Sequence, residues 1–235
     1  MTWWEWDSQQ APPDGVMLDP GPVFKTDRAT KIMAIGDSIT RGQGAEAQGG
    51  YRKPLWDALR ADGRTITPVG PFTAIAPTGY MAEGGWRIDD QTGVGARNLT
   101  GGNATDAVRQ YKPDVLLVAL GTNDVAQGIA ASQVNDYIAS YRLLLDSMYA
   151  FVPAAHVFVC RVVLLENQWS GTRTFNDRVQ AMTEAYQGKG RPYHVVVGME
   201  DMPTGSWADG LHPNKQGYDY MATVWKSAID AAAQT

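Results

Sequence analysis

The chain has 235 residues, of which 44% are hydrophobic and 19% are charged. This balance is typical of a globular domain with a sizeable core and unlike that of a disordered chain. The formal net charge is −5 and no Lys/Arg cluster occurs, which argues against a nucleic-acid partner. No stretch approaches the ~20 apolar residues of a transmembrane helix. We therefore expect one soluble domain without a membrane span. The sequence leaves open whether the protein is cytoplasmic or secreted, and it leaves the oligomeric state open as well.

Cysteine and histidine usage argues against a metal site. Cys160 is the only cysteine and lies in an apolar run, where a buried structural thiol is expected. The three histidines are scattered, so no metal-ligand cluster is visible. No glycine loop has the spacing of a phosphate-binding loop. We expect neither a metal nor a cofactor.

The first 30 residues form a segment of their own. They contain four prolines and three tryptophans, Trp3, Trp4 and Trp6, and show no sustained period. We interpret residues 1–30 as an irregular arm packed on the main domain, residues 31–235. The alternative is that its aromatic side chains form a surface for a sugar or a partner.

From Lys31 onward, short apolar runs alternate with segments of helical periodicity. The predicted strands are Lys31–Ile35, Ile66–Val69, Asp114–Leu120, His156–Val163 and His194–Val197. The predicted helices are Tyr51–Ala61, Asn103–Gln110, Ser132–Ala150, Thr172–Gln187 and Asn214–Ala232. This alternation predicts an α/β fold, in which helices cover both faces of a parallel sheet. Functional residues of such sheets gather beyond the carboxyl ends of the strands.

Ser38 directly follows the first predicted strand, in Ile35-Gly36-Asp37-Ser38-Ile39-Thr40. A serine on a glycine-permitted turn there can expose its hydroxyl and offer its own amide to a developing oxyanion. That arrangement suits a nucleophile. Taken alone, a Gly-Asp-Ser tripeptide more commonly shapes a turn or caps a helix.

His212 is the best candidate for a general base. His156 and His194 each open an apolar strand, where a structural histidine is the default interpretation. His212 instead lies in a loop between the last strand and the last helix, three residues after Asp209. Asp209 can reach Nδ1 of the ring and leave Nε2 free to take a proton from a hydroxyl.

Two further loops can supply oxyanion donors. Asn123 lies in Gly121-Thr122-Asn123-Asp124, directly after a predicted strand, and can point its side-chain amide toward Ser38. The alternative is an asparagine that caps the next helix. Gly84 and Gly85 precede Trp86, and a glycine amide there can approach a ligand closely, although such a pair can equally mark a plain turn.

Together, the blocks around Ser38, Gly85, Asn123 and His212 resemble the SGNH (GDSL) hydrolase family over roughly residues 31–232. The resemblance implies a flavodoxin-like three-layer α/β/α sandwich with a five-stranded parallel sheet, and ester hydrolysis through an acyl-serine. It matches Ser38 to the nucleophile, His212 to the base and Asp209 to the acid. It matches Gly85 and Asn123 to the oxyanion donors beside the Ser38 amide, with Gly84 as the alternative to Gly85.

The glycine-tryptophan block from Glu83 to Asp89 looks like that of the acetyl xylan esterase branch of this family. Asp37, Trp86 and Trp207 adjoin the motifs and are predicted to contact the substrate, although both indole rings suit core packing as well. The favoured function is a serine esterase for short-chain acyl esters, acetyl above all, on small molecules or carbohydrates. The alternatives are a broader lipolytic esterase, such as a lysophospholipase or thioesterase, and a catalytically silent carbohydrate-binding module.

Overall fold

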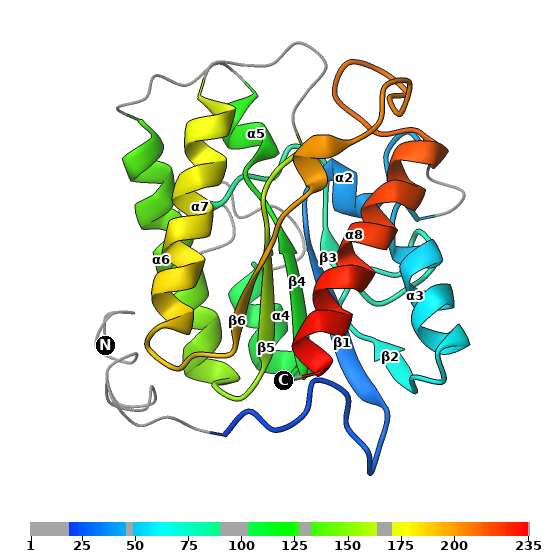
Figure 1. The fold of residues 1–235 in the computed structure, drawn as a ribbon, viewed down its shortest axis with the longest axis vertical. Coiled ribbons are helices and arrows are strands. Elements are labelled where there is room, and N and C mark those ends of the chain that lie inside the picture. The colour runs from blue at the N-terminus through cyan, green and yellow to red at the C-terminus, as the bar shows by residue number, and fades with distance from the viewer. Residues whose placement is uncertain (1–18, 46–48, 90–102, 127–132, 164–170, 235) are drawn as a thin grey trace.

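The computed structural model describes residues 19–45, 49–89, 103–126, 133–163 and 171–234. Within them, six strands form one parallel sheet (Figure 1). The strands are β1 (Thr30–Gly36), β2 (Ile66–Pro68), β3 (Met81–Ala82), β4 (Val115–Ala119), β5 (His156–Cys160) and β6 (Tyr193–Val196). Five of them lie in the order β2-β1-β4-β5-β6, and β3 pairs with the end of β1. The three-layer α/β fold is confirmed.

Helices cover both faces of the sheet, as Figure 1 shows. The helical elements are α2 (Ser38–Arg41), α3 (Arg52–Ala61), α4 (Ala104–Tyr111), α5 (Thr122–Val125), α6 (Val134–Phe151), α7 (Thr172–Gln187), the 3-10 turn η3 (Met199–Asp201) and α8 (Lys215–Ala233). None of the described helices combines the length and the apolar character that crossing a membrane takes.

Alternation along the central strands divides the interior into two cores. Successive side chains of a strand point to opposite faces. In β4, Leu116 and Val118 pack into the core beneath α4, α6 and α7, whereas Val115 and Leu117 pack into the core beneath α3 and α8. Both sets are buried because helices close both faces, which explains why these strands read as continuous apolar runs.

The described part of the N-terminal segment contacts the second core. Val23 and Phe24 are buried there, with 2% and 8% of their surface exposed. Trp3, Trp4 and Trp6 lie outside the described residues, so the packing of the whole arm stays a prediction.

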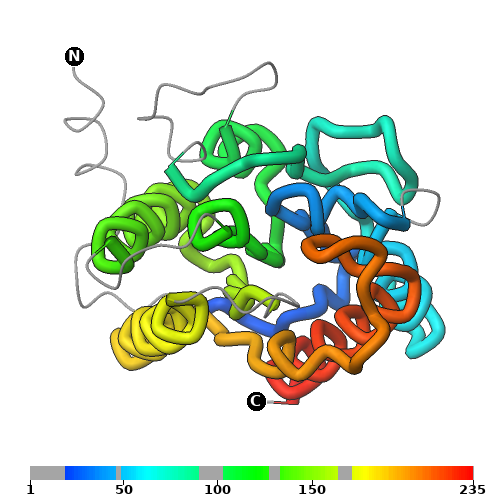
Figure 2. Tube along the Cα trace, turned by 90° about the horizontal axis from the view of Figure 1, so that it is seen from above, coloured from blue at the N-terminus to red at the C-terminus, as the bar shows by residue number. Residues whose placement is uncertain are grey.

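The carboxyl ends of the strands meet at one end of the sheet, uppermost in Figure 1, where α2 and α5 follow β1 and β4 directly. Seen from above in Figure 2, the orange loop that precedes α8 lies beside the blue segment that contains α2. The chain's first strand and its last loop therefore meet at this end, where the sequence places the functional residues.

Candidate active site

Ser38 is positioned by the tight junction between β1 and α2. A Cβ at Gly36 would lie 2.0 Å from Thr40 Oγ1 and 2.7 Å from the Ala119 carbonyl oxygen, so only glycine fits where the chain turns. Asp37 then caps α2, because its Oδ1 accepts a hydrogen bond of 2.9 Å from the Ile39 amide. Ser38 follows as the first residue of the helix, and 4% of its surface is exposed.

The predicted base and acid lie in line with this serine. His212 Nε2 is 3.0 Å from Ser38 Oγ, and His212 Nδ1 is 2.9 Å from Asp209 Oδ2. An ionised carboxylate only accepts hydrogen bonds, so the proton of a neutral imidazole belongs on Nδ1 and the lone pair on Nε2 faces the serine hydroxyl. The structure thus brings together the three residues that the sequence proposes as a triad.

Asp209 also shapes the loop that carries the histidine. Its Oδ1 accepts hydrogen bonds from the amides of Leu211 (2.8 Å) and His212 (2.7 Å). The hydrogen bond with the His212 ring, followed by the backbone hydrogen bonds, lowers the pKa of Asp209 to about 2, although 58% of its side chain is exposed. Asp209 is therefore ionised wherever His212 can act as a base.

The start of α8 holds the same loop in place. Asn214 caps α8 by accepting from the Gly217 amide, and its Nδ2 donates to the carbonyl oxygens of Gly205 (2.8 Å) and Trp207 (3.2 Å). One side chain thus connects the helix to the segment that leads into Asp209 and His212.

A buried arginine, whose role sequence reasoning missed, secures the other end of α2. Arg52 is fully buried, and its guanidinium donates to the carbonyl oxygens of Thr40 (2.9 Å), Arg41 (3.2 Å) and Pro77. It also lies 3.8 Å over the centre of the Tyr80 ring. The Thr40 and Arg41 carbonyl groups at the end of α2 would otherwise lack helical partners, so Arg52 stabilises the helix that begins with Ser38.

Asn123 lies on α5 with its amide group oriented. Its Nδ2 donates to the Trp86 carbonyl oxygen at 2.8 Å, which fixes which end of the side chain is the donor. An amide nitrogen carries two protons. Among the described residues no second acceptor engages it, so one N–H remains for a ligand.

The two glycines before Trp86 differ in what their amides do. The Gly84 amide donates to Glu83 Oε1 at 2.9 Å. Gly85 has φ +78°, and the described residues contain no hydrogen-bond acceptor for its amide. The Gly85 amide is thus the freer of the two for an external acceptor.

The three residues predicted to contact substrate differ in how deeply they are buried. Asp37 is completely buried, and burial raises its pKa from 3.8 to about 6, so it has no surface to offer a substrate. Trp86 is 6% exposed and packs edge-on against Phe72, with ring centres 5.7 Å apart, in a core role. Trp207 is only partly buried, beside the loop of His212.

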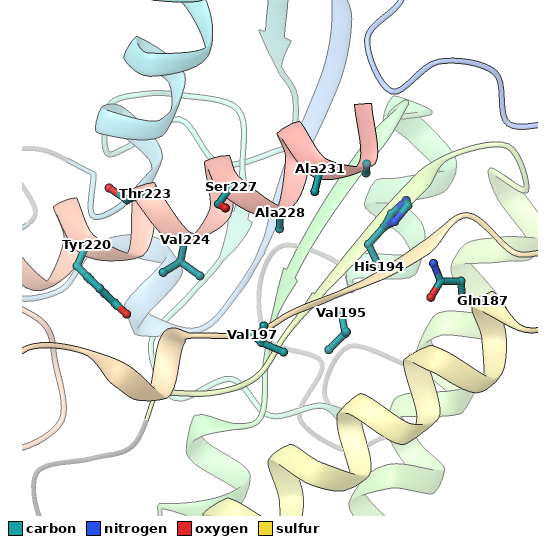
Figure 3. A pocket seen from close by; sticks show the side chains of 11 residues that line it. Gln187, His194, Val195, Val197, Tyr220, Thr223, Val224, Ser227, Ala228 and Ala231 are labelled. Carbon is teal, nitrogen blue, oxygen red and sulfur yellow. The ribbon is translucent and has the colours of Figure 1, made fainter. Parts of the chain in front are cut away.

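The other two histidines belong to a different part of the molecule. His156 begins β5, and its Nδ1 lies 3.1 Å from Nε2 of His194 in β6. Burial, together with the neighbouring His156, lowers the pKa of His194 to about 4. A groove of about 680 Å³ beside His194, between β6 and α8, is lined by none of the predicted site residues (Figure 3). Among the described residues, no three His, Cys, Asp or Glu side chains group as metal ligands.

Comparison with known proteins gives two curated relatives and solved structures that share the fold. A multidomain esterase of Ruminococcus flavefaciens is 30% identical over 239 aligned positions, which cover 91% of this chain and 30% of that protein. An acetylxylan esterase / glucomannan deacetylase of Cellvibrio japonicus is 27% identical over 145 positions, 57% of this chain and 40% of that protein. This chain therefore matches less than half the length of either curated relative.

A solved structure shares the fold. The Clostridium thermocellum family 3 carbohydrate esterase superposes with a TM-score of 0.73 at 22% identity, covering 88% of this chain and 98% of that one. The model of the GDSL-like lipase/acylhydrolase family matches residues 34–220, a span that runs from β1 through Ser38, Asn123, Asp209 and His212 into α8. The chain therefore belongs to the GDSL-like lipase/acylhydrolase family.

Proposed function

We propose that this chain is a serine esterase that removes short acyl groups, acetyl above all, from small-molecule or carbohydrate esters through an acyl-Ser38 intermediate. The observation that carries the proposal is the continuous line of hydrogen bonds from Ser38 Oγ through the His212 ring to Asp209. A hydroxyl that faces the lone pair of an oriented imidazole is an activated nucleophile.

The proposed reaction proceeds in two halves. His212 Nε2 accepts the proton of Ser38 as Oγ bonds to the ester carbonyl carbon, and the same ring then protonates the departing alkoxide. In the second half, a water molecule attacks the acyl-serine with the same proton transfers through His212, and the carboxylic acid is released. The carbonyl oxygen becomes negative in both halves, and we assign its stabilisation to three donors, the amides of Ser38 and Gly85 and the Asn123 side chain.

The proposed preference for acetyl esters of carbohydrates rests on the name of one relative and on one side chain. The Cellvibrio japonicus relative is named an acetylxylan esterase / glucomannan deacetylase. Trp207 is only partly buried beside the His212 loop, where an aromatic face can stack on a sugar ring. A broader lipolytic esterase remains the second candidate, favoured by the acylhydrolase family match alone.

The direct test combines an ester panel with a nucleophile variant. We expect p-nitrophenyl acetate and acetylated xylan to be hydrolysed faster than long-chain esters up to palmitate. Ser38→Ala should lower kcat by a factor of about 10⁴ or more while Tm stays close to wild type. Ser147→Ala, which truncates a buried serine of α6, is the matched control and should keep its activity.

The outcomes separate the candidates. A preference for palmitate would favour the lipolytic enzyme, and no turnover of any ester would leave a binding module. A fluorophosphonate probe should attach to Ser38, and attachment to a different serine would remove the nucleophile assignment.

A further inference from the structure

Two consecutive side chains of α5 hold the loop that contains Gly85. Asn123 Nδ2 donates to the Trp86 carbonyl oxygen at 2.8 Å. Asp124 accepts from the Ile88 amide, whose nitrogen lies 3.3 Å from Oδ2 and 3.4 Å from Oδ1. The segment that directly follows Gly85 is therefore attached at two points to the helical turn that also presents Asn123.

Gly85 carries no side chain whose packing could fix its position. Within the described part of the chain, a Cβ built on it would find no atom within 4 Å apart from its two chain neighbours, and its φ of +78° is one that glycine adopts freely. Trp86 and Ile88, by contrast, are 6% and 0% exposed. The position of the Gly85 amide is thus set by how its neighbours are anchored.

Asp124 is an unusual anchor, because it is a carboxylate with 1% of its surface exposed. Burial is the largest effect on it and raises its pKa to about 7, while the hydrogen bond from Ile88 opposes that change. The Ile88 amide is itself buried and needs an acceptor. A costly acidic side chain therefore satisfies a backbone donor beside the proposed site.

We propose that Asp124 is a positioning residue for the oxyanion hole: by holding the Ile88 amide, it sets the Gly85 amide at the correct separation from the Asn123 side chain. This inference rests on the proposed function. Asp124 does not touch the substrate, and its effect passes through the loop from Gly85 to Ile88.

The kinetic test compares Asp124→Ala with Asp124→Asn. The alanine variant leaves the Ile88 amide without an acceptor, and we expect kcat to fall about 10- to 100-fold with KM changed less than about threefold. This loss is smaller than the ~10²–10³ for removal of a whole donor, because the hole is misplaced rather than lost. Asparagine keeps one side-chain oxygen and should restore kcat to within about fivefold of wild type. It also serves if the alanine variant does not fold.

A matched control loses a comparable hydrogen bond far from the site. Tyr193 Oη donates to the buried Leu145 carbonyl oxygen at 2.9 Å, at the start of β6. Tyr193→Phe should lower Tm while leaving kcat unchanged. If it lowered kcat as much as Asp124→Ala does, the effect would be one of general stability and the proposal would be overturned.

A double-mutant cycle identifies the route of the effect. Asn123→Ala alone should lower kcat about 10²–10³-fold. With Asn123 absent, Asp124→Ala should cost less than threefold more, because the two residues serve one hole. Fully multiplicative losses would contradict a shared hole.

Backbone NMR separates failure of this inference from failure of the proposed function. In Asp124→Ala, the Ile88 amide should exchange with solvent faster and the Gly85 amide resonance should shift, with neither change in Tyr193→Phe. If these changes occur while kcat stays at the wild-type value, the loop from Gly85 to Ile88 does not govern catalysis. If they occur and wild type cleaves no ester, the esterase proposal fails but the anchoring role of Asp124 stands. An unchanged Ile88 amide would refute the anchoring itself.

Discussion

The buried carboxylate of Asp37 makes the free energy of unfolding depend on pH. Burial raises its pKa from 3.8 to about 6, so between these values the folded state holds more protons than the unfolded state. Stability therefore falls as pH rises through this window, by roughly 3 kcal/mol for a shift of this size. Asp124 acts in the same direction up to about pH 7.

We expect Asp37→Asn to reduce that pH dependence. Asparagine caps helices as well as aspartate does but does not ionise, so the change in stability between pH 4 and pH 7 should lose the roughly 3 kcal/mol that Asp37 contributes. The contribution of Asp124 and the opposing contribution of His194 remain. Urea unfolding at several pH values measures this pH dependence. Asp106→Asn, which changes a partly exposed acid in the first turn of α4, is the control and should keep the wild-type slope. If Asp37→Asn left the slope of stability against pH unchanged, groups other than Asp37 would cause the pH dependence.

At this scale the sequence predicts the reacting groups better than it predicts their surroundings. Ser38 and His212 could be proposed because each follows a strand and chemistry needs a hydroxyl near an imidazole. The sequence could not decide the burial of Asp37, since a polar residue beside a nucleophile has the same signature whether it faces the substrate or caps a helix. It could not decide that of Trp86 either, since an indole ring suits a core and a substrate surface equally. Roles such as that of Asp124, which depend on a contact 36 residues away at Ile88, carry no local signal.

At the scale of elements, Asn214 serves both α8 and the loop of the base. We expect Asn214→Ala to cost about 1–2 kcal/mol of stability through the lost cap. It should also lower kcat about 3- to 10-fold, because the segment before Asp209 loses both donors from Nδ2. Asn103→Ala removes the cap of α4, where Oδ1 accepts from the Asp106 amide, and within the described residues Asn103 has no such connection to the site.

Urea unfolding and steady-state kinetics on the two variants separate these effects. Both should lose similar stability, and only Asn214→Ala should lose kcat. Asn214→Asp keeps the cap acceptor without the donors, so it should preserve most of the stability but not the activity. Equal kcat in all three variants would show that the loop keeps its position without Asn214.

The length of an element decides how well the sequence predicts it. The predicted strand Asp114–Leu120 and the observed β4 (Val115–Ala119) differ by one residue at each end, and α7 (Thr172–Gln187) begins and ends as predicted. The predicted strand His156–Val163 instead ends at Cys160. Strand β3 has two residues and α2 and α5 have four each, too few for any period to be visible. These short elements exist because tertiary pairing with β1 and caps such as Asp37 support them.

At the scale of the whole molecule, one sheet supports two separate cores. Ile138 of α6 packs in one core and Ile229 of α8 in the other. We expect Ile138→Val and Ile229→Val each to cost about 0.5–1.5 kcal/mol. The double variant should lose the sum within about 0.5 kcal/mol, because distant sites do not couple. Calorimetry should show one cooperative transition in all three variants, and two resolved transitions would mean that the cores unfold independently.

The meeting of β1 with the loop before α8 has a consequence for the order in which the protein is made. Ser38 and His212 are 174 positions apart, so on the ribosome the nucleophile is made first and its base is the last of the triad to be added. Folding proceeds while synthesis is under way, yet the serine has no partner until the final loop and α8 join the sheet. A nascent chain therefore carries an inert hydroxyl while the 174 positions up to His212 are added, and its reactivity begins only when almost all of this domain exists.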